Sequence, residues 1–169
     1  NTFGYAMGQP LTRVDPSGLT TTVVVTIDHR VGTHAAVHTT EGGGVLYDPA
    51  GGYPGASSEY STRGSGDLFT GADASLNSYI DYQRGSGSEV RMYSFPTTKE
   101  QELEIQRNME DEGGATGGFC AINSANALRG VGPFKGLDWY LFPKSLGEKL
   151  QTLPNVQMKV YPRVKKENP

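Results

Sequence analysis

Residues 20–39 read TTTVVVTIDHRVGTHAAVHT, and this stretch decides the fold. Residues 20–27 are a run of Thr, Val and Ile, whose β-branched side chains favour a well-buried strand. Residues 33–39 and 44–48 are two more short strand candidates, and the Gly-containing residues 40–43 between them are typical of a hairpin connection. The sequence therefore predicts a small antiparallel meander of three strands.

The segment after this meander shows no helical or strand period. Residues 49–71 are rich in Gly, Ser and Pro, which predicts a long surface loop, and loops of this length are often substrate lids. Helical spacing of apolar residues predicts a short helix over residues 75–82. Alternating side chains predict a strand over residues 89–95.

The second half of the sequence is mainly helical. Thr97 and Glu100 fit a capping box that opens a helix, and Gly113 ends it. An Ala-rich helix follows over residues 121–129 and is closed by Gly130. We also expect a helix that begins at Pro143 and a final strand, over residues 143–150 and 156–161. This order indicates an α+β fold with a small antiparallel sheet packed against helices.

Length and composition limit the classes of function. A chain of 169 residues fits one domain with a core of its own. Its net charge of −3 leaves no basic excess to bind phosphates, so nucleic acid is not an expected partner. One Cys and three His do not make a structural zinc site, and the apolar runs are too short to span a bilayer. We therefore expect no metal, no cofactor and no stable membrane span.

Cys120, the only cysteine, is the candidate nucleophile. It would lie at the N-terminus of the Ala-rich helix, where unpaired backbone N–H groups and the helix dipole lower the pKa of a thiol. The alternative is an inert cysteine that packs as a small hydrophobe. A function for Cys120 therefore depends on a base nearby.

A thiolate hydrolase needs an imidazole, and the chain offers His29, His34 and His38. His29 lies in a turn-like segment, whereas His34 and His38 are four residues apart and project from one face of the same strand. Either of these two remains a candidate base. If His34 is the base, we expect His38 and Asp28 to be solvated residues at strand ends.

The hairpin register decides which carboxylate lies beside the imidazole. If Thr39 pairs with Gly43 across a three-residue turn, His34 falls directly opposite Asp48 on the next strand. Asp48 is then the candidate third member of a triad. A slip of one residue would break this pairing, because it turns every side chain to the other face.

Residues 10–19 read PLTRVDPSGL and contain a turn motif made of Pro10, Asp15, Pro16 and Gly18. With the preceding NTFGY, this string resembles the end of the core of Rhs-repeat proteins, large bacterial shells that carry a variable toxin at their C-terminus. In that family the core cleaves itself just after the Leu of the motif, which implies a cut between Leu19 and Thr20. The resemblance implies that residues 1–19 end the Rhs core and residues 20–169 are the toxin domain.

This resemblance also implies a biological setting. The chain would be a secreted effector that is delivered into a target cell. Its partners would be the Rhs shell of the parent chain, a macromolecular substrate and a cognate immunity protein.

Residues 33–38 (THAAVH) and 45–48 (VLYD) are similar to the opening of circularly permuted papain-like hydrolases, the NlpC-like group that includes the lecithin:retinol acyltransferase-like enzymes. Cys120, followed by Leu128, Arg129 and Gly130, looks like the later helix of that family. The resemblance implies the circularly permuted papain-like fold. It also implies a catalytic triad of Cys120, His34 and Asp48.

Two departures from the acyltransferase pattern bear on the substrate. Ala35 follows His34 where those members usually have an aromatic residue, and Asp48 stands where several have His. These differences favour an amide over a lipid acyl group. The candidate substrates are peptidoglycan peptides and the peptide bonds or Gln side chains of proteins, with Asn123 and Ser124 as candidates for substrate contact. A lipid acyl hydrolase or acyltransferase of the same fold, and a non-enzymatic toxin that acts on membranes or by binding, are the alternatives.

Overall fold

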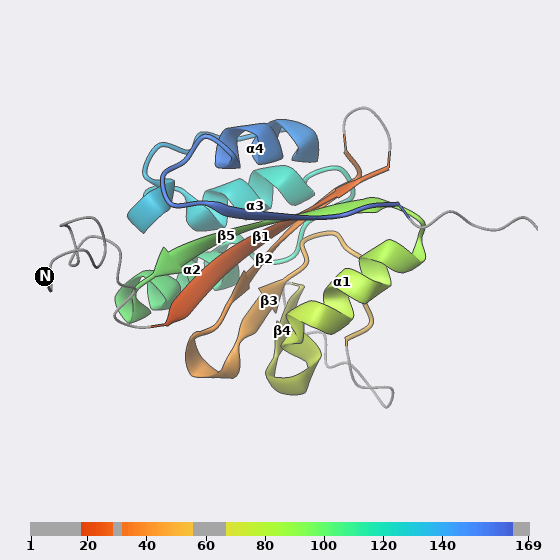
Figure 1. Cartoon of the computed structure of the whole chain (residues 1–169). Coiled ribbons are helices and arrows are strands. Elements are labelled where there is room, and N and C mark those ends of the chain that lie inside the picture. The colour runs from red at the N-terminus through yellow and green to blue at the C-terminus, as the bar shows by residue number, and fades with distance from the viewer. Residues whose placement is uncertain (1–17, 29–31, 56–66, 164–169) are drawn as a thin grey trace, which may run out of the picture.

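The strands form one open antiparallel sheet. The structure, a computed structural model, describes residues 18–28, 32–55 and 67–163. Within these ranges six strands lie in the order β4-β3-β2-β1-β5-β6 (Figure 1). Their bounds are β1 (Leu19–Ile27), β2 (His34–Thr39), β3 (Val45–Tyr47), β4 (Leu68–Thr70), β5 (Glu89–Thr97) and β6 (Gln157–Tyr161).

Helices cover both faces of this sheet, with α2, α3 and α4 on one side and α1 on the other (Figure 1). The four α-helices in the described part of the chain are α1 (Leu76–Gly85), α2 (Lys99–Glu112), α3 (Cys120–Leu128) and α4 (Pro143–Leu150). The short 3-10 helices of the described residues are η2 (Glu41–Gly43), η3 (Gly71–Ala74) and η4 (Gly132–Phe134). The expected α+β class, with an antiparallel sheet packed on helices, is confirmed.

The central position of β1 explains its composition. β1 lies between β2 and β5, so both of its edges are paired, and helices cover both of its faces. Val23 and Val25 pack on the side of α2, α3 and α4, whereas Val24 packs on the side of α1, and all three are buried. A strand that is buried on both faces reads as a continuous apolar run, and this is why the sequence TTTVVVTI marks the middle of the sheet.

The predicted meander is confirmed, because β1, β2 and β3 are antiparallel neighbours. Its predicted register is wrong: Thr39 pairs with Val45 and not with Gly43, since η2 and Gly44 lengthen the turn. His34 is therefore not directly opposite Asp48. The observed pairing continues from Val37 and Tyr47 to the level of Ala36 and Asp48, which makes Asp48 a diagonal neighbour of His34 on the same face.

Residues 49–71 are not a plain surface loop. Residues 68–70 form β4, which pairs with β3, and Tyr53 is buried in edge-to-face contact with Phe69 and Tyr79. A three-residue strand is too short to show a period, so the sequence pattern could not reveal it. Residues 56–66 lie outside the described residues.

The remaining elements agree with the predictions except for small shifts of their ends. The capping box of α2 lies one residue later than predicted, with Thr98 as N-cap and Gln101 as its reciprocal partner. Thr97 instead ends β5 and donates its hydroxyl to the buried Glu102 at 2.7 Å. The predicted α1, α3, α4, β5 and β6 are all present.

The candidate cleavage site lies at the start of β1. Leu19 is the first residue of β1 and pairs with Thr97, and Thr20 follows it in the strand. Gly18 precedes them with φ of 64°, a left-handed conformation that favours glycine. The described residues do not include Pro10, Asp15, Pro16 and His29.

Candidate active site

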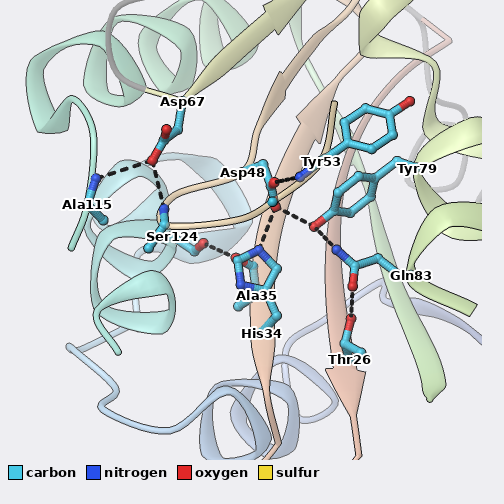
Figure 2. A network of polar contacts seen from close by, with 12 residues as sticks. Thr26, His34, Ala35, Asp48, Tyr53, Asp67, Tyr79, Gln83, Ala115 and Ser124 are labelled. Atoms are coloured by element: carbon cyan, nitrogen blue, oxygen red, sulfur yellow. Dashed lines mark hydrogen bonds and ion pairs between the residues drawn. The ribbon is translucent and has the colours of Figure 1, made fainter. Parts of the chain in front are cut away.

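The imidazole of His34 and the carboxylate of Asp48 form a close pair. His34 opens β2, Asp48 directly follows β3, and His34 Nε2 lies 2.5 Å from Asp48 Oδ1 (Figure 2). The Asp48 side chain is fully buried and that of His34 is 13% exposed. A buried carboxylate at this distance orients the ring and keeps a proton on Nε2.

Two further donors hold the Asp48 carboxylate. The Tyr79 hydroxyl donates to the same Oδ1 atom at 2.7 Å, and the backbone N–H of Tyr53 donates to Oδ2 at 3.2 Å (Figure 2). Burial would raise the pKa of Asp48, but the hydrogen bond and charge of His34 and the bond from Tyr79 outweigh it and lower the pKa below its ordinary value. Asp48 is therefore an anion at neutral pH.

Cys120 is the first residue of α3 and is 5% exposed. The N-cap residue Phe119 makes no side-chain hydrogen bond to the first turn of the helix. Burial would raise the pKa of the Cys120 thiol, but the hydrogen bond and charge of His34 and backbone hydrogen bonds from Ala35 and Ala121 lower it. The thiol therefore ionises more readily than an ordinary cysteine.

His34 connects the carboxylate to the thiol. Burial lowers the pKa of His34, but hydrogen bonds to Asp48 and Cys120 outweigh burial and raise the pKa from 6.5 to about 9. Because Nε2 faces Asp48, Nδ1 is the ring nitrogen left for Cys120. The thiol pKa falls while the imidazole pKa rises, and both shifts favour a thiolate–imidazolium pair.

Two residues fix the loop that carries Asp48. A Cβ atom on Gly51 would lie 1.9 Å from Asp48 Oδ2, so the carboxylate occupies space that only glycine leaves free. The Asp67 carboxylate accepts the N–H groups of Ala50 at 2.7 Å and Ala115 at 3.3 Å. These two bonds tie the loop after β3 to the loop before α3 (Figure 2), and so link the Asp48 and Cys120 sides of the site.

Ser124 and Asn123 differ in their surroundings. Ser124 is fully buried and donates its hydroxyl to the carbonyl of Ala35 at 3.2 Å. The expected substrate contact is therefore wrong for Ser124, which instead binds α3 to the His34 strand. Asn123 is half-buried and donates to the Tyr47 hydroxyl at 3.4 Å, and its substrate contact stays a prediction.

The expectation that His38 is solvated is wrong. His38 is only 8% exposed, and within the described residues its Nδ1 atom has no hydrogen-bond partner. Burial lowers the pKa of His38 to about 4, although a backbone hydrogen bond with Ala74 acts in the opposite direction. Of the two candidate bases, it is His34 whose hydrogen bond and charge lower the pKa of the Cys120 thiol. Asp28 lies 3.8 Å from Arg163 in an ion pair near the end of β1.

The residues that support Asp48 from α1 and β1 were not predicted from the sequence. Gln83 Nε2 donates to the Tyr79 hydroxyl at 2.9 Å, and Thr26 Oγ1 donates to Gln83 Oε1 at 3.2 Å. Helical spacing marked position 79 only as an inward-facing apolar residue. The available signal was a second polar side chain four residues later on the same buried helix face.

Within the described ranges, no group of three or more His, Cys, Asp or Glu side chains is arranged to hold a metal ion. No helix of those ranges is both long and apolar enough to cross a membrane. No family model, curated protein or solved structure matches this chain.

Proposed function

We propose that this chain is a cysteine hydrolase with Cys120 as nucleophile, His34 as general acid and base, and Asp48 as the residue that orients the imidazole. The observation that carries the proposal is the 2.5 Å contact between His34 Nε2 and Asp48 Oδ1, made by a ring whose hydrogen bond and charge also lower the pKa of the Cys120 thiol. The lowered pKa of Cys120 and the raised pKa of His34 support an activated thiolate and not an inert cysteine.

The reaction proceeds in two steps. The Cys120 thiolate attacks the carbonyl carbon of the substrate, and the imidazolium of His34 gives its proton to the leaving group as that group's bond to carbon breaks. The products are a thioester and a neutral imidazole. The imidazole then takes a proton from water, the water oxygen attacks the thioester, and cleavage of the C–S bond restores the thiolate–imidazolium pair.

The start of α3 supports stabilisation of the oxyanion. The first N–H groups of an α-helix have no acceptor within the helix, and Phe119 does not cap them with its side chain. The N–H of Cys120 and a second donor from the same turn are our candidates for the oxyanion site. Gly117 and Gly118, just before it, are exposed, and a Cβ atom on either would meet nothing within 4 Å. We infer that a substrate approaches the sulfur over these two glycines.

We assign the chain to the circularly permuted papain-like hydrolases. The support is the order of elements, because the strands that carry His34 and lead to Asp48 precede the helix that begins at Cys120. α3 also lies against the His34 strand through the bond from Ser124 to Ala35. Ala35 and Asp48 differ from the residues that acyltransferase members usually have at these positions. We therefore propose an amide substrate: a bond in a peptidoglycan peptide, or a peptide bond or Gln side chain of a protein.

We further propose that residues 20–169 are the toxin of an Rhs-repeat protein. A cut between Leu19 and Thr20 would remove only the first residue of β1, so the sheet would keep its central strand. The released toxin would act in a target cell and be neutralised by a cognate immunity protein. Mass spectrometry of the product released from the parent chain tests this, because the proposal requires Thr20 at its N-terminus.

The substrate class is tested by exposing muropeptides, bacterial proteins and lipid extracts to the wild type and to Cys120→Ala. We expect the wild type to hydrolyse an amide in the first or second sample and Cys120→Ala to leave all three unchanged. Release of fatty acids from the lipid extract would instead favour the alternative, a lipid acyl hydrolase of the same fold. Equal killing of target cells by both proteins would overturn the enzymatic proposal in favour of a non-enzymatic toxin.

Alkylation tests the thiolate pair without a substrate. Iodoacetamide should label wild-type Cys120 at pH 6 to 7 faster than a model thiol, because the imidazolium of His34 holds the thiolate. His34→Gln should lose this advantage. His38→Gln is the matched control and should keep it, because His34, not His38, contacts the thiol. Slow labelling of the folded wild type would contradict the proposal.

A further inference from the structure

A line of hydrogen bonds leads away from the active site to α1 and on to β1. The Tyr79 hydroxyl donates to Asp48 Oδ1 at 2.7 Å, Gln83 Nε2 donates to the Tyr79 oxygen at 2.9 Å, and Thr26 Oγ1 donates to Gln83 Oε1 at 3.2 Å (Figure 2). All three of these donors are buried. Each link donates towards Asp48, so the whole line stabilises the negative charge of its carboxylate.

This line closes into a ring through the sheet. Thr26 is the cross-strand partner of His34 in the β1–β2 ladder. The line therefore starts opposite the imidazole and ends on the carboxylate that holds the imidazole. Since the ring joins two strands and α1, a movement of α1 against the sheet would break at least one of its bonds.

We propose that Tyr79 and Gln83 are positioning residues of the active site, which hold Asp48 in place and limit how strongly its carboxylate binds the imidazolium of His34. This inference rests on the proposed function. Tyr79 and His34 donate to the same oxygen, Oδ1, and so share its negative charge. A carboxylate that already accepts a phenol is a weaker partner for the imidazolium, which then releases its proton more readily.

The groups that act on this pair come from three elements. Asp48 and Cys120, from the loop after β3 and from α3, act on His34 directly, and Tyr79 acts from α1 through Asp48. Burial and the nearby charge of Asp48 raise the pKa of Tyr79 well above its ordinary value. Tyr79 therefore stays protonated, and remains a donor, over the whole pH range in which the thiolate–imidazolium pair exists.

The decisive variant is Tyr79→Phe, which removes the donor oxygen and keeps the ring. We expect the pKa of His34, followed by NMR titration of its imidazole, to rise by about half a unit to one unit. With p-nitrophenyl acetate as probe, release of the acetyl group from Cys120 at pH 7 should slow by about three- to tenfold, because the neutral fraction of the imidazole falls by this factor when its pKa rises. Tyr93→Phe is the matched control: Tyr93 is also buried, but on the opposite face of the sheet, and should change neither quantity.

Gln83→Met tests the second link of the line. It should shift the His34 titration in the same direction by a smaller amount, because Tyr79 then loses the donor that holds its oxygen. The double variant with Tyr79→Phe should equal Tyr79→Phe alone, since Gln83 acts only through Tyr79. If Tyr79→Phe does not fold, Gln83→Met decides: an unchanged titration and an unchanged deacylation rate would overturn the inference.

The outcomes separate this inference from the proposed function. A His34 pKa near its ordinary value of 6.5, together with slow Cys120 alkylation in the wild type, would overturn the proposed hydrolase function. A wild type with the thiolate–imidazolium pair, together with a folded Tyr79→Phe variant that matches Tyr93→Phe in both measurements, would overturn only the positioning role.

Discussion

The carboxylate of Asp48 occupies the place where a side chain on Gly51 would begin, with 1.9 Å between Oδ2 and the position of a Cβ atom. Gly51→Ala should therefore displace Asp48 from His34, lower the pKa of His34 and slow Cys120 alkylation at pH 6.5 by at least tenfold. The neighbouring Gly52→Ala is the control, because its Cβ atom would meet only the end of the Tyr82 side chain at 3.1 Å. Equal alkylation rates in the two variants would contradict this account of Gly51.

The pH dependence of hydrolysis should be bell-shaped. On the acid side, activity falls as Cys120 becomes protonated, at a pH below the ordinary pKa of a cysteine. On the alkaline side, activity falls near pH 9, because His34 then loses the proton that it gives to the leaving group. Asp48→Asn should move the alkaline limb to lower pH, since it removes the charge that raises the pKa of His34. An alkaline limb that stays in place in Asp48→Asn would argue against the contact between the two residues.

His38 should make the fold sensitive to acid. Its pKa is about 4 in the folded chain and 6.5 as a free group, so its contribution to stability is intact above about pH 6.5 and is lost as the pH falls towards 4. The expected loss between pH 7 and pH 4.5 is about 2 kcal/mol. Urea unfolding of the wild type and His38→Leu at both pH values measures it. The variant should lose less stability than the wild type by this amount, and parallel losses would show that His38 is not buried in the neutral form.

Ser124→Ala should loosen the contact between α3 and β2. The variant leaves the buried carbonyl of Ala35 without the Ser124 hydroxyl, which costs about 1 to 2 kcal/mol in the free energy of unfolding. Because this bond joins the helix that begins at Cys120 to the residue that follows His34, we also expect slower alkylation of Cys120. Thermal unfolding and iodoacetamide labelling check the two effects. Stability lost without any change in alkylation would mean that the bond does not align the two residues.

Glu102 should affect stability alone. Its buried carboxylate accepts the N–H groups of Thr40 at 2.7 Å and Glu41 at 2.6 Å at the turn between β2 and β3. Among the described residues, its hydrogen bonds do not include His34, Asp48 or Cys120. Glu102→Gln replaces one acceptor oxygen by a donor, which should cost about 1 to 3 kcal/mol. Denaturant unfolding measures the loss, and Cys120 alkylation under native conditions should stay at the wild-type rate. A slower alkylation would show that this turn supports the site after all.

The fold was predictable where local pattern and tertiary structure agree. The run of β-branched residues in β1 specifies a doubly covered strand, and the Gly and Pro residues that bound α3 and α4 mark where these helices end or begin. β4 escaped prediction because three residues carry no period. The register of β2 and β3 escaped it because the turn geometry of residues 41–44, not the strand pattern, determines which residues face each other.

The three residues of the candidate triad were predictable from residue type and element order, but their surroundings were not. Asp48 reaches His34 diagonally and not from the opposite position. Tyr79 and Gln83 meet Asp48 only through the docking of α1 on the sheet, which no local pattern encodes. His38 is a histidine on the same strand as His34, so the sequence alone makes it an equal candidate for the base. Only the packing around His38 shows that it is a buried, neutral side chain.

The thiol comes from α3, the imidazole from β2 and the carboxylate from the loop after β3, so no single segment of the chain holds enough of the machinery to react. Under the proposed function, a nascent or unfolded copy would contain every reacting atom and still be inactive. Hydrolysis would thus report on native packing, and would vanish in a state that kept its helices and strands but let α3 drift from the sheet.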